Sequence, residues 1–455
     1  MIKKILIANR GEIALRIMRA CQSLNIQTVA VYSEADKESD FVKFADESYL
    51  IGEPPVNQSY LDSDKIIDIA KKAEVDAVHP GYGFLSESSL FAKLCADNDI
   101  IFIGPDAELI KKMGDKVSSR KLMEDAGIPT IPGSKDVILT PDDALKEAES
   151  IGYPLMLKAS AGGGGIGMQI VHDKDLLKDA FVNNSKRAEQ FFGDGSMFIE
   201  KLLINARHIE VQLLADNHGN VIHLYERECS IQRRNQKVVE EAPSRFISEK
   251  TRELMGEAAV KAAQKLNYTN AGTIEFLVDE NENFYFLEMN TRVQVEHGIT
   301  EEVTHIDIVK EQIKIANNQT LTISQSDVKL NGHSIEGRIY AEDPLTSFPS
   351  PGEITKYIEP EGDQIRIESA ISGPSRITHF YDPMISKLIV TGKDRDEAIK
   401  LFQQALDDYE IIGIKTNIPM LKAIAKNEAF IKGDTATNFI DENKVELQKT
   451  IQEEL

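Results

Sequence analysis

One segment, residues 272–298 (GTIEFLVDENENFYFLEMNTRVQVEHG), constrains the fold more than any other part of the chain. Two apolar runs flank a short polar stretch, a pattern that predicts a β-hairpin turning near Asn281 and Glu282. A turn centred between these two residues places Glu275 directly opposite Glu288 on the partner strand. Like charges in such a pair repel each other unless a cation lies between them.

The second strand of this hairpin continues into a row of polar side chains at every second position. Because alternate residues of an extended chain share one face, we expect a common face formed by Glu288, Asn290, Arg292, Gln294 and Glu296. This set combines oxygen ligands suited to Mg²⁺, an arginine suited to an oxyanion and a carboxylate that can accept a proton. The alternative interpretation is a half-buried antiparallel strand whose polar face meets solvent.

A second unusual segment, residues 157–170 (LKASAGGGGIGMQI), packs five glycines into six positions. Glycine loses roughly 0.5–1 kcal/mol more than alanine on ordering, so such a run indicates a need for bare backbone. The apolar segments on both sides predict that the glycines lie at the tip of a hairpin. Peptide N–H groups there can contact phosphate oxygens, which predicts a mobile phosphate lid, with a structural loop as the alternative. The spacing fits neither a P-loop nor a dinucleotide fingerprint.

Elsewhere, apolar runs alternate with helical patterns. Ile13, Ile17, Cys21 and Leu24 follow helical spacing between two short apolar runs, which predicts a strand–helix–strand unit with parallel strands. A β-rich unit closed by two helices is expected after residue 332, followed by a charged, peripheral end. We therefore expect a chain of mixed α/β and α+β class with several domains.

The charge balance restricts the partners. The 52 basic and 74 acidic residues leave a net charge of −22, which disfavours general binding to nucleic acid or to an anionic membrane. An anionic substrate then requires a local positive pocket. Candidates are Lys116, Lys158, Lys201 and the basic cluster 233–237, and the alternative for each is a solvated side chain.

Two further residues have open interpretations. His208 precedes a predicted alternating strand, where a lone histidine is more often structural than a ligand. Arg338 shares a predicted strand face with Glu336 and Tyr340, and an ion pair with Glu336 is the alternative to a binding role.

The three cysteines, Cys21, Cys95 and Cys229, are far apart and lack C-x-x-C spacing, so neither a disulfide framework nor a zinc site is expected. The apolar run near the N-terminus is too short for a signal peptide, and no 18-residue apolar stretch occurs. We expect a cytoplasmic protein that binds neither nucleic acid nor membrane.

Several long motifs taken together resemble the biotin carboxylases of the ATP-grasp superfamily. The similarity extends from Ile2 to about Asn438 and includes KILIANRGEIALRIMRAC, VHPGYGFLSE, KASAGGGGIGM, RHIEVQ, ERECSIQRRNQKVVEEAPS, AGTIEFL, EMNTRVQVEHGITE and FPSPGEI. The resemblance implies an ATP-grasp fold with a Rossmann-like N-terminal α/β domain at 1–114. It also implies an ATP-grasp domain at 115–330 with a small mobile lid at about 130–202, a β-rich C-terminal domain at 331–446 and a charged tail at 447–455.

The activity implied by the resemblance is the carboxylation of biotin on a carrier protein with ATP, bicarbonate and Mg²⁺ or Mn²⁺. The implied ATP contacts are Lys116, Lys158, Gly164, Gly165, Glu200, Lys201, Leu203, His208, Gln232, Asn235, Glu275 and Glu288. The implied metal ligands are Glu275, Glu288 and Asn290, and the implied bicarbonate contacts are Lys237, Arg292, Gln294 and Val295. Glu296 is implied as the base that deprotonates bicarbonate, and Arg338 as the residue that stabilises the biotin anion.

The sequence departs from the family pattern at a few positions. Asn235 stands where histidine is usual, Ile166 where the glycine loop usually carries a basic residue, and Gly298 where proline is usual. Gly337 and Glu228 are smaller departures. The missing basic residue at 166 implies altered nucleotide affinity or lid closure, whereas all implied metal and proton-handling positions are present.

The chain lacks an A-M-K-M biotinylation motif and a carboxyltransferase region, so it resembles a free-standing component of an acetyl-CoA carboxylase built from several subunits. The implied partners are a biotin carboxyl carrier protein, carboxyltransferase subunits and a second copy of the chain. Components of acyl-CoA, pyruvate or urea carboxylases are alternatives. Two further alternatives are an ATP-grasp ligase acting on another acid and a nucleotide-binding paralogue with a regulatory role.

Overall fold

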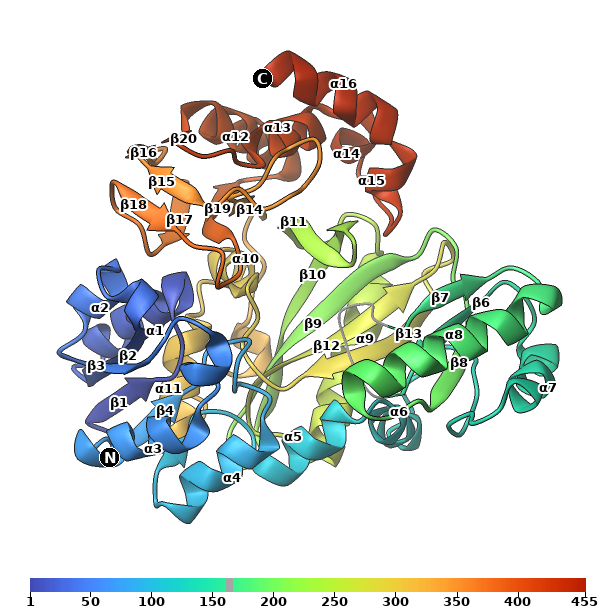
Figure 1. Ribbon diagram of the computed structural model, residues 1–455, viewed down its shortest axis with the longest axis horizontal. Coiled ribbons are helices and arrows are strands. Elements are labelled where there is room, and N and C mark those ends of the chain that lie inside the picture. The colour runs from blue at the N-terminus through green and yellow to red at the C-terminus, as the bar shows by residue number, and fades with distance from the viewer. Residues whose placement is uncertain (161–166) are drawn as a thin grey trace.

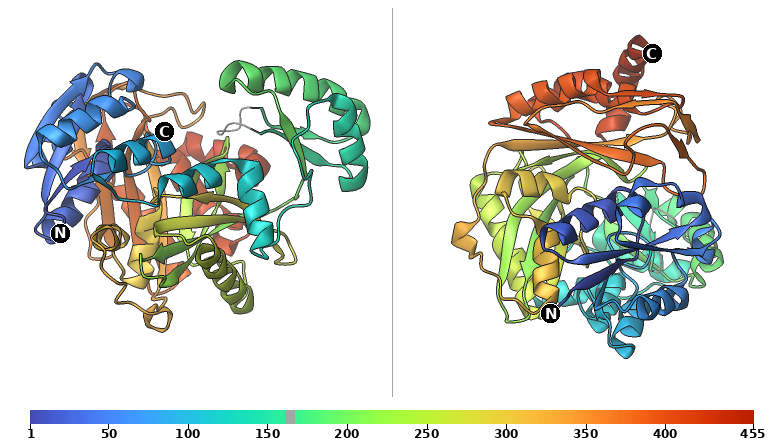
Figure 2. Two further views of the ribbon diagram at one scale, coloured as in Figure 1. Left: turned by 90° about the horizontal axis from the view of Figure 1, so that it is seen from below. Right: turned by 90° about the vertical axis from the view of Figure 1, so that its left-hand side faces the viewer.

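The computed structural model describes residues 1–160 and 167–455. Figures 1 and 2 show a large body from which a smaller lobe, containing β6–β8, α7 and α8, projects to one side. The central part of the predicted glycine loop, with Gly164, Gly165 and Ile166, lies outside the described residues. No helix within the two described ranges is long and apolar enough to cross a membrane.

The N-terminal part is a five-stranded parallel sheet in the order β3-β2-β1-β4-β5. Ile13, Ile17 and Cys21 are buried on α1 beneath this sheet, so the predicted parallel strand–helix–strand unit is confirmed. The elements are β1 (Lys4–Ile7), α1 (Gly11–Ser23), β2 (Gln27–Ser33), α2 (Asp40–Phe44), β3 (Glu47–Gly52), α3 (Ser63–Lys72), β4 (Ala77–His79), α4 (Ser89–Asp97), β5 (Ile101–Phe102) and α5 (Ala107–Gly114).

Helix α6 (Lys116–Asp125) leads into the projecting lobe, an antiparallel sheet in the order β7-β6-β8 covered by two helices. The lobe contains α7 (Pro141–Ile151), β6 (Leu155–Ala159), β7 (Gln169–Val171), α8 (Lys174–Phe192) and β8 (Met197–Lys201). Leu157 pairs with Gln169 across the two strands that flank the glycine run, which confirms the predicted hairpin.

The centre of the molecule is an eight-stranded sheet in the order β13-β12-β9-β10-β11-β14-β19-β17. Its strands are β9 (Arg207–Ala215), β10 (Val221–Arg233), β11 (Gln236–Ala242), β12 (Asn270–Val278), β13 (Phe284–Asn290), β14 (His333–Tyr340), β17 (Ile365–Ser369) and β19 (Met384–Gly392). Strand β11 pairs with β14, so the β-rich part expected after residue 332 continues the sheet that begins before it. This continuity fixes the orientation of side chains on β14 relative to those on β9–β13.

Helices cover this sheet from several sides. They are α9 (Glu249–Lys265), α10 (His297–Thr304), α11 (Ile308–Ala316), α12 (Arg395–Asp408), α13 (Ile418–Lys426), α14 (Glu428–Lys432), α15 (Phe439–Glu442) and α16 (Lys444–Glu454). Two small antiparallel pairs complete the fold: β15 (Gly352–Ile354) with β18 (Ser375–Ile377), and β16 (Lys356–Ile358) with β20 (Glu410–Ile412).

The charged C-terminal end is an ordered helix that packs on the C-terminal core. The last residues form α16, which packs against α13 at the top of Figure 1. Leu447 and Ile451, four positions apart on one face of the helix, are buried in the C-terminal core. The charged residues of this segment therefore occupy the solvent face of an amphipathic helix.

Gly337 illustrates how closely β14 packs on α12. Its neighbours on the strand, Glu336 and Arg338, face one side of the sheet, while the Cα of Gly337 faces the ring of Phe402 on α12. A Cβ atom at position 337 would lie 2.6 Å from Cζ of Phe402, closer than real contacts allow.

We predict that Gly337→Ala lowers the free energy of unfolding by about 1–3 kcal/mol, because the methyl group overpacks a closed core. Phe402→Leu in the same chain makes room and is expected to recover part of the loss. Gly373→Ala, at a position with no atom within 4 Å of the new Cβ, is the matched control. Urea unfolding of the four proteins measures these differences, and equal losses at positions 337 and 373 would contradict the packing argument.

Candidate active site

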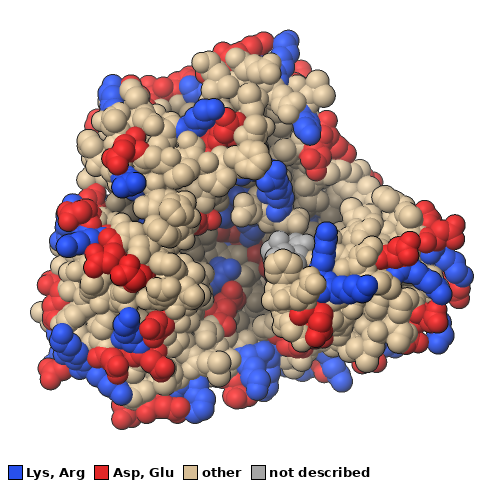
Figure 3. All heavy atoms as spheres, in the orientation of Figure 1, with Lys and Arg blue, Asp and Glu red and all other residues tan. Residues whose placement is uncertain are grey.

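Charged side chains gather in a hollow on one face of the molecule, between the N-terminal part, the C-terminal part and the projecting lobe (Figure 3). Seven of the residues predicted to form a site lie on six strands of the large sheet. They are His208 on β9, Gln232 on β10, Lys237 on β11, Glu275 on β12, Glu288 and Asn290 on β13, and Arg338 on β14.

The hairpin β12–β13 pairs Glu275 with Glu288, as predicted, although its turn does not lie where we expected it. The residue pairs nearer the turn, such as Phe276 with Phe286, are symmetric about Asn281. The turn is therefore centred on Asn281, whereas we expected its centre between Asn281 and Glu282. A register shift next to Glu275 then adds one residue on the β13 side and brings Glu288 opposite Glu275. This irregularity, a β-bulge, decides which side chains face the site.

The two carboxylates of this pair differ in environment. Glu275 is buried, whereas Glu288 is exposed to solvent and has no hydrogen-bond partner among the described residues. The pKa of Glu288 is raised, first because the surrounding walls restrict its hydration and second because the Glu275 carboxylate repels its charge. A carboxylate in this position gains from a bound cation.

The prediction of one extended row from Glu288 to Glu296 is wrong beyond Asn290, where β13 ends. The backbone N–H of Thr291 donates to Glu87 of the N-terminal part, so a side chain takes the place of a strand partner. Residues 291–296 then turn into α10.

Three side chains of this turn nevertheless gather around the carboxylate pair. Arg292 donates to the Asn290 side-chain oxygen at 2.8 Å, and Gln294 donates to Glu275 at 2.7 Å. Glu296 lies 2.6 Å from Lys237. The residues predicted to act together are therefore close together, although the strand geometry expected to align them is absent.

Lys237 is the electrostatic centre of the site. Its Nζ lies 2.6 Å from Glu210, 3.0 Å from Glu275 and 2.6 Å from Glu296. Burial opposes its charge, yet the three carboxylates raise the pKa of Lys237 well above its ordinary value. Burial likewise opposes the charge of Glu275, but Lys237 and His208 hold the pKa of this carboxyl well below its ordinary value. The lysine and its acidic neighbours are therefore ionised at neutral pH.

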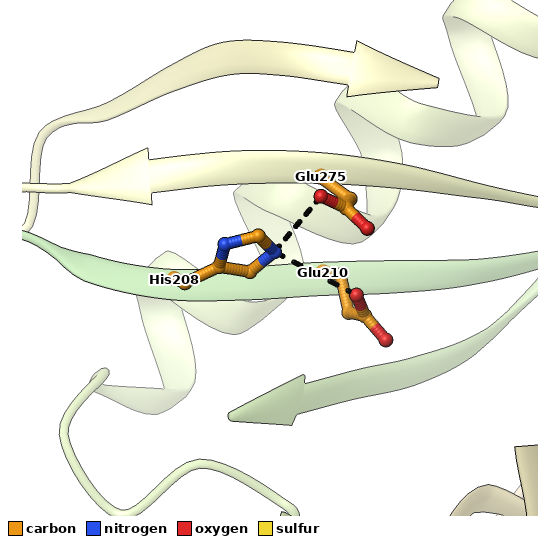
Figure 4. A group of neighbouring side chains, drawn as sticks. All are labelled: His208, Glu210 and Glu275. Atoms are coloured by element: carbon orange, nitrogen blue, oxygen red, sulfur yellow. Dashed lines mark ion pairs between the residues drawn. The ribbon is translucent and has the colours of Figure 1, made fainter. Parts of the chain in front are cut away.

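His208 lies on β9 with its ring between two of these carboxylates (Figure 4). Its Nε2 is 3.0 Å from Glu275 and 3.8 Å from Glu210, and the Gln232 amide lies 3.1 Å from Nδ1. Burial lowers the pKa of His208, but the charge of Glu275 and the hydrogen bonds to Glu210 and Glu275 together outweigh it and raise the value to about 9. The strand predicted to alternate in polarity here is buried along its whole length.

Sequence reasoning missed Arg227 of β10, whose side chain is fully buried. It donates to the side chains of Glu210, Gln212, Thr273, Gln294 and Thr300 at distances of 2.6–3.2 Å. Because it holds the Gln294 side-chain oxygen at 2.7 Å, Arg227 also fixes which way this amide points. The signal in the sequence was the run of charges at 226–228 inside a strand flanked by apolar residues.

Arg338 pairs with partners that the local pattern did not show. Its guanidinium contacts Glu240 of β11 at 2.6 Å and Glu296 at 3.0 Å, whereas the alternative partner considered from sequence, Glu336, has no hydrogen bond to it. Lys237 and Arg338 thus contact different oxygens of Glu296. One carboxylate links the predicted bicarbonate residue with the predicted biotin residue.

The projecting lobe supplies a second, smaller group. On one face of its sheet Lys158 is paired with Glu200, which also accepts a hydrogen bond from Arg120 of α6 at 3.0 Å. Burial lowers the pKa of Lys116, which lies at the start of α6. The positive charge of nearby Lys158 lowers it further. A negatively charged ligand between these lysines would relieve the repulsion.

Lys201 does not belong to this group. It follows Glu200 on β8 and therefore points to the opposite face, where its ammonium donates to the Tyr153 carbonyl at 3.1 Å. A contact of Lys201 with a ligand beside Glu200 must therefore come from its backbone. Leu203 lies just beyond this strand, in the connection to β9.

Asn235 lies at the exposed tip of the β10–β11 hairpin. Arg234 and Asn235 both have positive φ, 52° and 62°, as in a type I′ turn, which favours asparagine. Backbone conformation is therefore a sufficient reason for asparagine at this position. The departure at Gly298 has a packing reason, since a Cβ there would lie 2.5 Å from Ile389 Cδ1.

Two further residues hold the turn at 291–296 in place and were not predicted. Glu87 accepts a hydrogen bond from Arg292 Nε at 2.9 Å. The fully buried Lys387 of β19 donates to the Val295 carbonyl at 2.7 Å. Because both partners are distant in sequence, no local pattern could have shown them.

Comparison with known proteins identifies the class. Residues 115–324 match the model of the carbamoyl-phosphate synthase L chain ATP-binding domain. Residues 1–110 match the biotin carboxylase N-terminal domain, and residues 336–442 match the biotin carboxylase C-terminal domain. The chain belongs to the biotin carboxylase family, whose members are ATP-dependent ligases with an ATP-grasp fold.

Individual relatives support this family assignment. The chain is 57% identical to biotin carboxylase 2 of Bacillus subtilis over 97% of its own length and 100% of the relative. It is 57% identical to the biotin carboxylase of Halalkalibacterium halodurans, over 97% of each chain. Its fold matches the biotin carboxylase domain of Hydrogenobacter thermophilus 2-oxoglutarate carboxylase, solved as a dimer with MgADP, ADP and bicarbonate, with a TM-score of 0.95, 48% identity and 98% and 99% coverage. It matches Campylobacter jejuni biotin carboxylase in a β,γ-ATP complex equally well, with a TM-score of 0.95, 48% identity and 97% and 99% coverage.

We predict that Lys237→Met reverses the pH dependence of stability in the absence of divalent ions. In the native chain, ionised Glu210 and Glu275 with lowered pKa values contribute stability at neutral pH that is lost on acidification. Without Lys237 the carboxylates repel, at least one pKa rises above its unfolded value, and stability should increase as the pH falls from about 8 to about 5.

Urea unfolding at both pH values measures this effect. We expect a loss of about 3–5 kcal/mol at the higher pH, as for other broken buried charge pairs, and a smaller loss at the lower pH. Lys310→Met removes a half-exposed i,i+3 pair and serves as the matched control. An equal loss at both pH values would contradict the assigned role of the ammonium charge.

Proposed function

We propose that this chain carboxylates biotin on a carrier protein, using ATP and bicarbonate. The observation that carries the proposal is the position of Lys237, whose Nζ lies within 3.0 Å of Glu210, Glu275 and Glu296 while Arg338 contacts the same Glu296. A cationic group that can hold a small oxyanion is thus next to a carboxylate that can take a proton. The relative from Hydrogenobacter thermophilus was solved with MgADP and bicarbonate.

Bicarbonate is assigned to the space bounded by Lys237, Arg292, Gln294 and the Val295 backbone. Burial disfavours the charge of Glu296, but Lys237, Arg338 and Arg227 together lower the pKa of this carboxyl below its ordinary value, so it is ionised and can accept a proton. As bicarbonate loses that proton, Lys237 and Arg292 stabilise the charge that develops on it. Arg292 is oriented for this role by its bonds to Glu87 and Asn290.

Glu275, Glu288 and Asn290 fit a Mg²⁺ or Mn²⁺ site. All three offer oxygen atoms, and the cross-strand carboxylate pair carries like charges that a cation would neutralise. Glu288, exposed and without a hydrogen-bond partner in the described part of the chain, is free to bind. When bound, the metal would neutralise charge on the phosphoryl group being transferred.

ATP is assigned to the space between the lobe and the large sheet. The residues assigned to it are Lys116, Lys158, Gly164, Gly165, Glu200, the backbone of Lys201, Leu203, His208, Gln232, Asn235, Glu275 and Glu288. Burial and the charge of nearby Lys158 lower the pKa of Lys116, and a phosphate held by both lysines would offset this repulsion. The glycine run would add backbone N–H donors.

In the proposed reaction a bicarbonate oxygen attacks the γ-phosphorus of ATP and ADP leaves, giving carboxyphosphate. This decomposes to CO₂ and phosphate, and the phosphate takes the proton from the ureido nitrogen of biotin. The biotin anion then attacks CO₂, while Arg338 stabilises its negative charge. Glu240 and Glu296 hold the Arg338 guanidinium in place for this step.

We assign the chain to a cytoplasmic carboxylase of several different subunits, as a homodimer acting with a biotin carboxyl carrier protein and carboxyltransferase subunits. Acetyl-CoA carboxylase is the proposed complex. Relatives named for pyruvate and propionyl-CoA carboxylation support other acceptors as alternatives. Identifying the biotinylated protein that co-purifies with the chain decides among them.

An assay of phosphate release from ATP tests the proposed function. We expect release that depends on bicarbonate and rises with free biotin. Release that depends on another acid would favour a different ATP-grasp ligase. Tight ATP binding without release in the presence of both substrates would favour a regulatory paralogue.

We predict that Glu296→Gln lowers bicarbonate-dependent ATP cleavage by about 10²- to 10⁴-fold, because the amide cannot accept the proton. Metal affinity should change little, since Glu296 is not among the assigned ligands. Steady-state kinetics and Mn²⁺ binding measure the two effects, with Glu302→Gln on α10 as the control. An unchanged rate would exclude Glu296 as the base.

We predict that Arg338→Ala abolishes the response to biotin while ATP affinity stays within about threefold of the native value, because the assigned ATP residues lie on other strands. Arg376→Ala, at an exposed position, is the control. Nucleotide titration and biotin-dependent ATP cleavage are the measurements. A parallel loss of ATP affinity and biotin response would contradict the assignment.

A further inference from the structure

Behind Arg338 lies a pair of acidic residues that the proposed mechanism does not use. Glu240 on β11 and Glu336 on β14 are directly opposite each other across neighbouring strands. Both are 0% exposed. Residues paired in this way have Cβ atoms about 4.5–5.5 Å apart, so two ionised carboxylates here repel each other at close range.

The pair has too few hydrogen-bond donors for two carboxylates. Among the described residues, neither oxygen of Glu336 has a hydrogen-bond partner, and Oε2 of Glu240 has none either. The remaining oxygen, Oε1 of Glu240, accepts from Nε of Arg338 at 2.6 Å. An ionised, unpaired carboxylate is among the most costly groups to bury, whereas a protonated carboxyl is neutral and brings a donor of its own.

The charges around Glu336 come from its own strand and from four other segments. Arg338 shares its strand face, and Lys387 of β19 and Arg366 of β17 are the other cations nearby. Its acidic neighbours are Glu240 and Glu296, and the hydroxyl of Tyr82 lies near enough to be influenced by its charge. The cations are already engaged: Lys387 with the Val295 carbonyl, Arg338 with Glu240 and Glu296, and Arg366 with Glu301, Glu302 and Glu368.

We propose that Glu240 is a positioning residue for Arg338, and that Glu240 and Glu336 together retain one proton, carried by Glu336, while the enzyme works. The inference rests on the proposed function, because it concerns the residue assigned to biotin. With this proton in place, Arg338 faces two carboxylates, Glu240 and Glu296. Without it a third negative charge would oppose the anion that forms on biotin.

The raised pKa values of both acids agree with this arrangement. Burial is the main cause for each, and it raises the pKa of Glu240 to about 7 and that of Glu336 well above its ordinary value. Because the two groups interact, the proton belongs to the pair, and the ion pair with Arg338 favours the charged form of Glu240.

Infrared spectroscopy tests the proton directly on the full chain. Because other buried glutamates can also be protonated, we expect the difference between the native and Glu336→Gln spectra at neutral pH to contain a band of a protonated carboxyl group. The corresponding difference for Glu353→Gln, a change at an exposed carboxylate on β15, should lack this band. Absence of the band from the Glu336→Gln difference spectrum would overturn the proposal.

Stability as a function of pH gives a second, independent readout. A carboxyl whose folded pKa is raised lowers stability progressively as the pH rises above its unfolded value of about 4.5. Glutamine removes this dependence, so Glu336→Gln should melt above the native protein, by a difference that grows from pH 5.5 to pH 7.5. A Glu336→Gln protein that fails to fold, or that melts below the native protein, contradicts a neutral Glu336.

Kinetics test the positioning role. Glu336→Gln should keep biotin-dependent ATP cleavage within about threefold, because glutamine imitates the protonated acid. Glu240→Gln should lower it at least about tenfold through kcat and the KM for biotin, with the KM for ATP unchanged, and Glu240→Asp should restore part of the loss. Equal losses for both glutamine variants, or a parallel rise in the KM for ATP, would overturn the role of Glu240.

These outcomes are separable from failure of the proposed function. If the native chain shows no biotin-dependent ATP cleavage, the proposed function fails, and the infrared and stability measurements still decide whether the pair holds a proton.

Discussion

The positive charge of Lys237 is the interaction on which the rest of the site depends. Glu210, Glu275 and Glu296 come from β9, β12 and the residue before α10, and each reaches the same ammonium group. Without a cation among them these buried carboxylates repel one another, so the lysine removes a repulsion between the neighbouring strands β9 and β12 and links both to the residue before α10. The buried side chain of Arg227 makes a second set of such links, because it donates hydrogen bonds to Glu210 and Gln294. The groups assigned to chemistry are therefore also groups that hold this part of the fold together.

Local patterns in the sequence predicted the elements of the fold well. Helical spacing identified α1, and apolar segments identified the hairpin that carries the glycine run. These local patterns failed where a segment distant in sequence determines the local structure. The strand β13 ends at Asn290 because Glu87, about two hundred residues earlier in the chain, takes the next backbone donor. The final helix was missed because its apolar face consists of few residues, Leu447 and Ile451.

For the candidate site, some contacts were predicted from the sequence and others were not. Cross-strand pairing of Glu275 with Glu288 followed from the hairpin, but the bulge that produces it leaves no signature in residue type. Adjacent positions on one strand point to opposite faces, so the orientation of Lys201 relative to Glu200 was available from the sequence and was overlooked. The partners of Arg338 were not available, since Glu240 is 98 residues away along the chain. Roles of individual residues came from family resemblance, and their geometric reasons came from the structure.

The pairing of β11 with β14 makes the large sheet continuous across the boundary between the second and third family domains. Separating the chain there would leave two long strands with unpaired backbone groups, a state prone to association with other chains. Exchange of whole segments between related carboxylases should therefore be tolerated poorly at this junction. Among the described residues, the projecting lobe shares no strand with that sheet, so changes in the length of its outer connections should disturb the sheet less than a break at this junction.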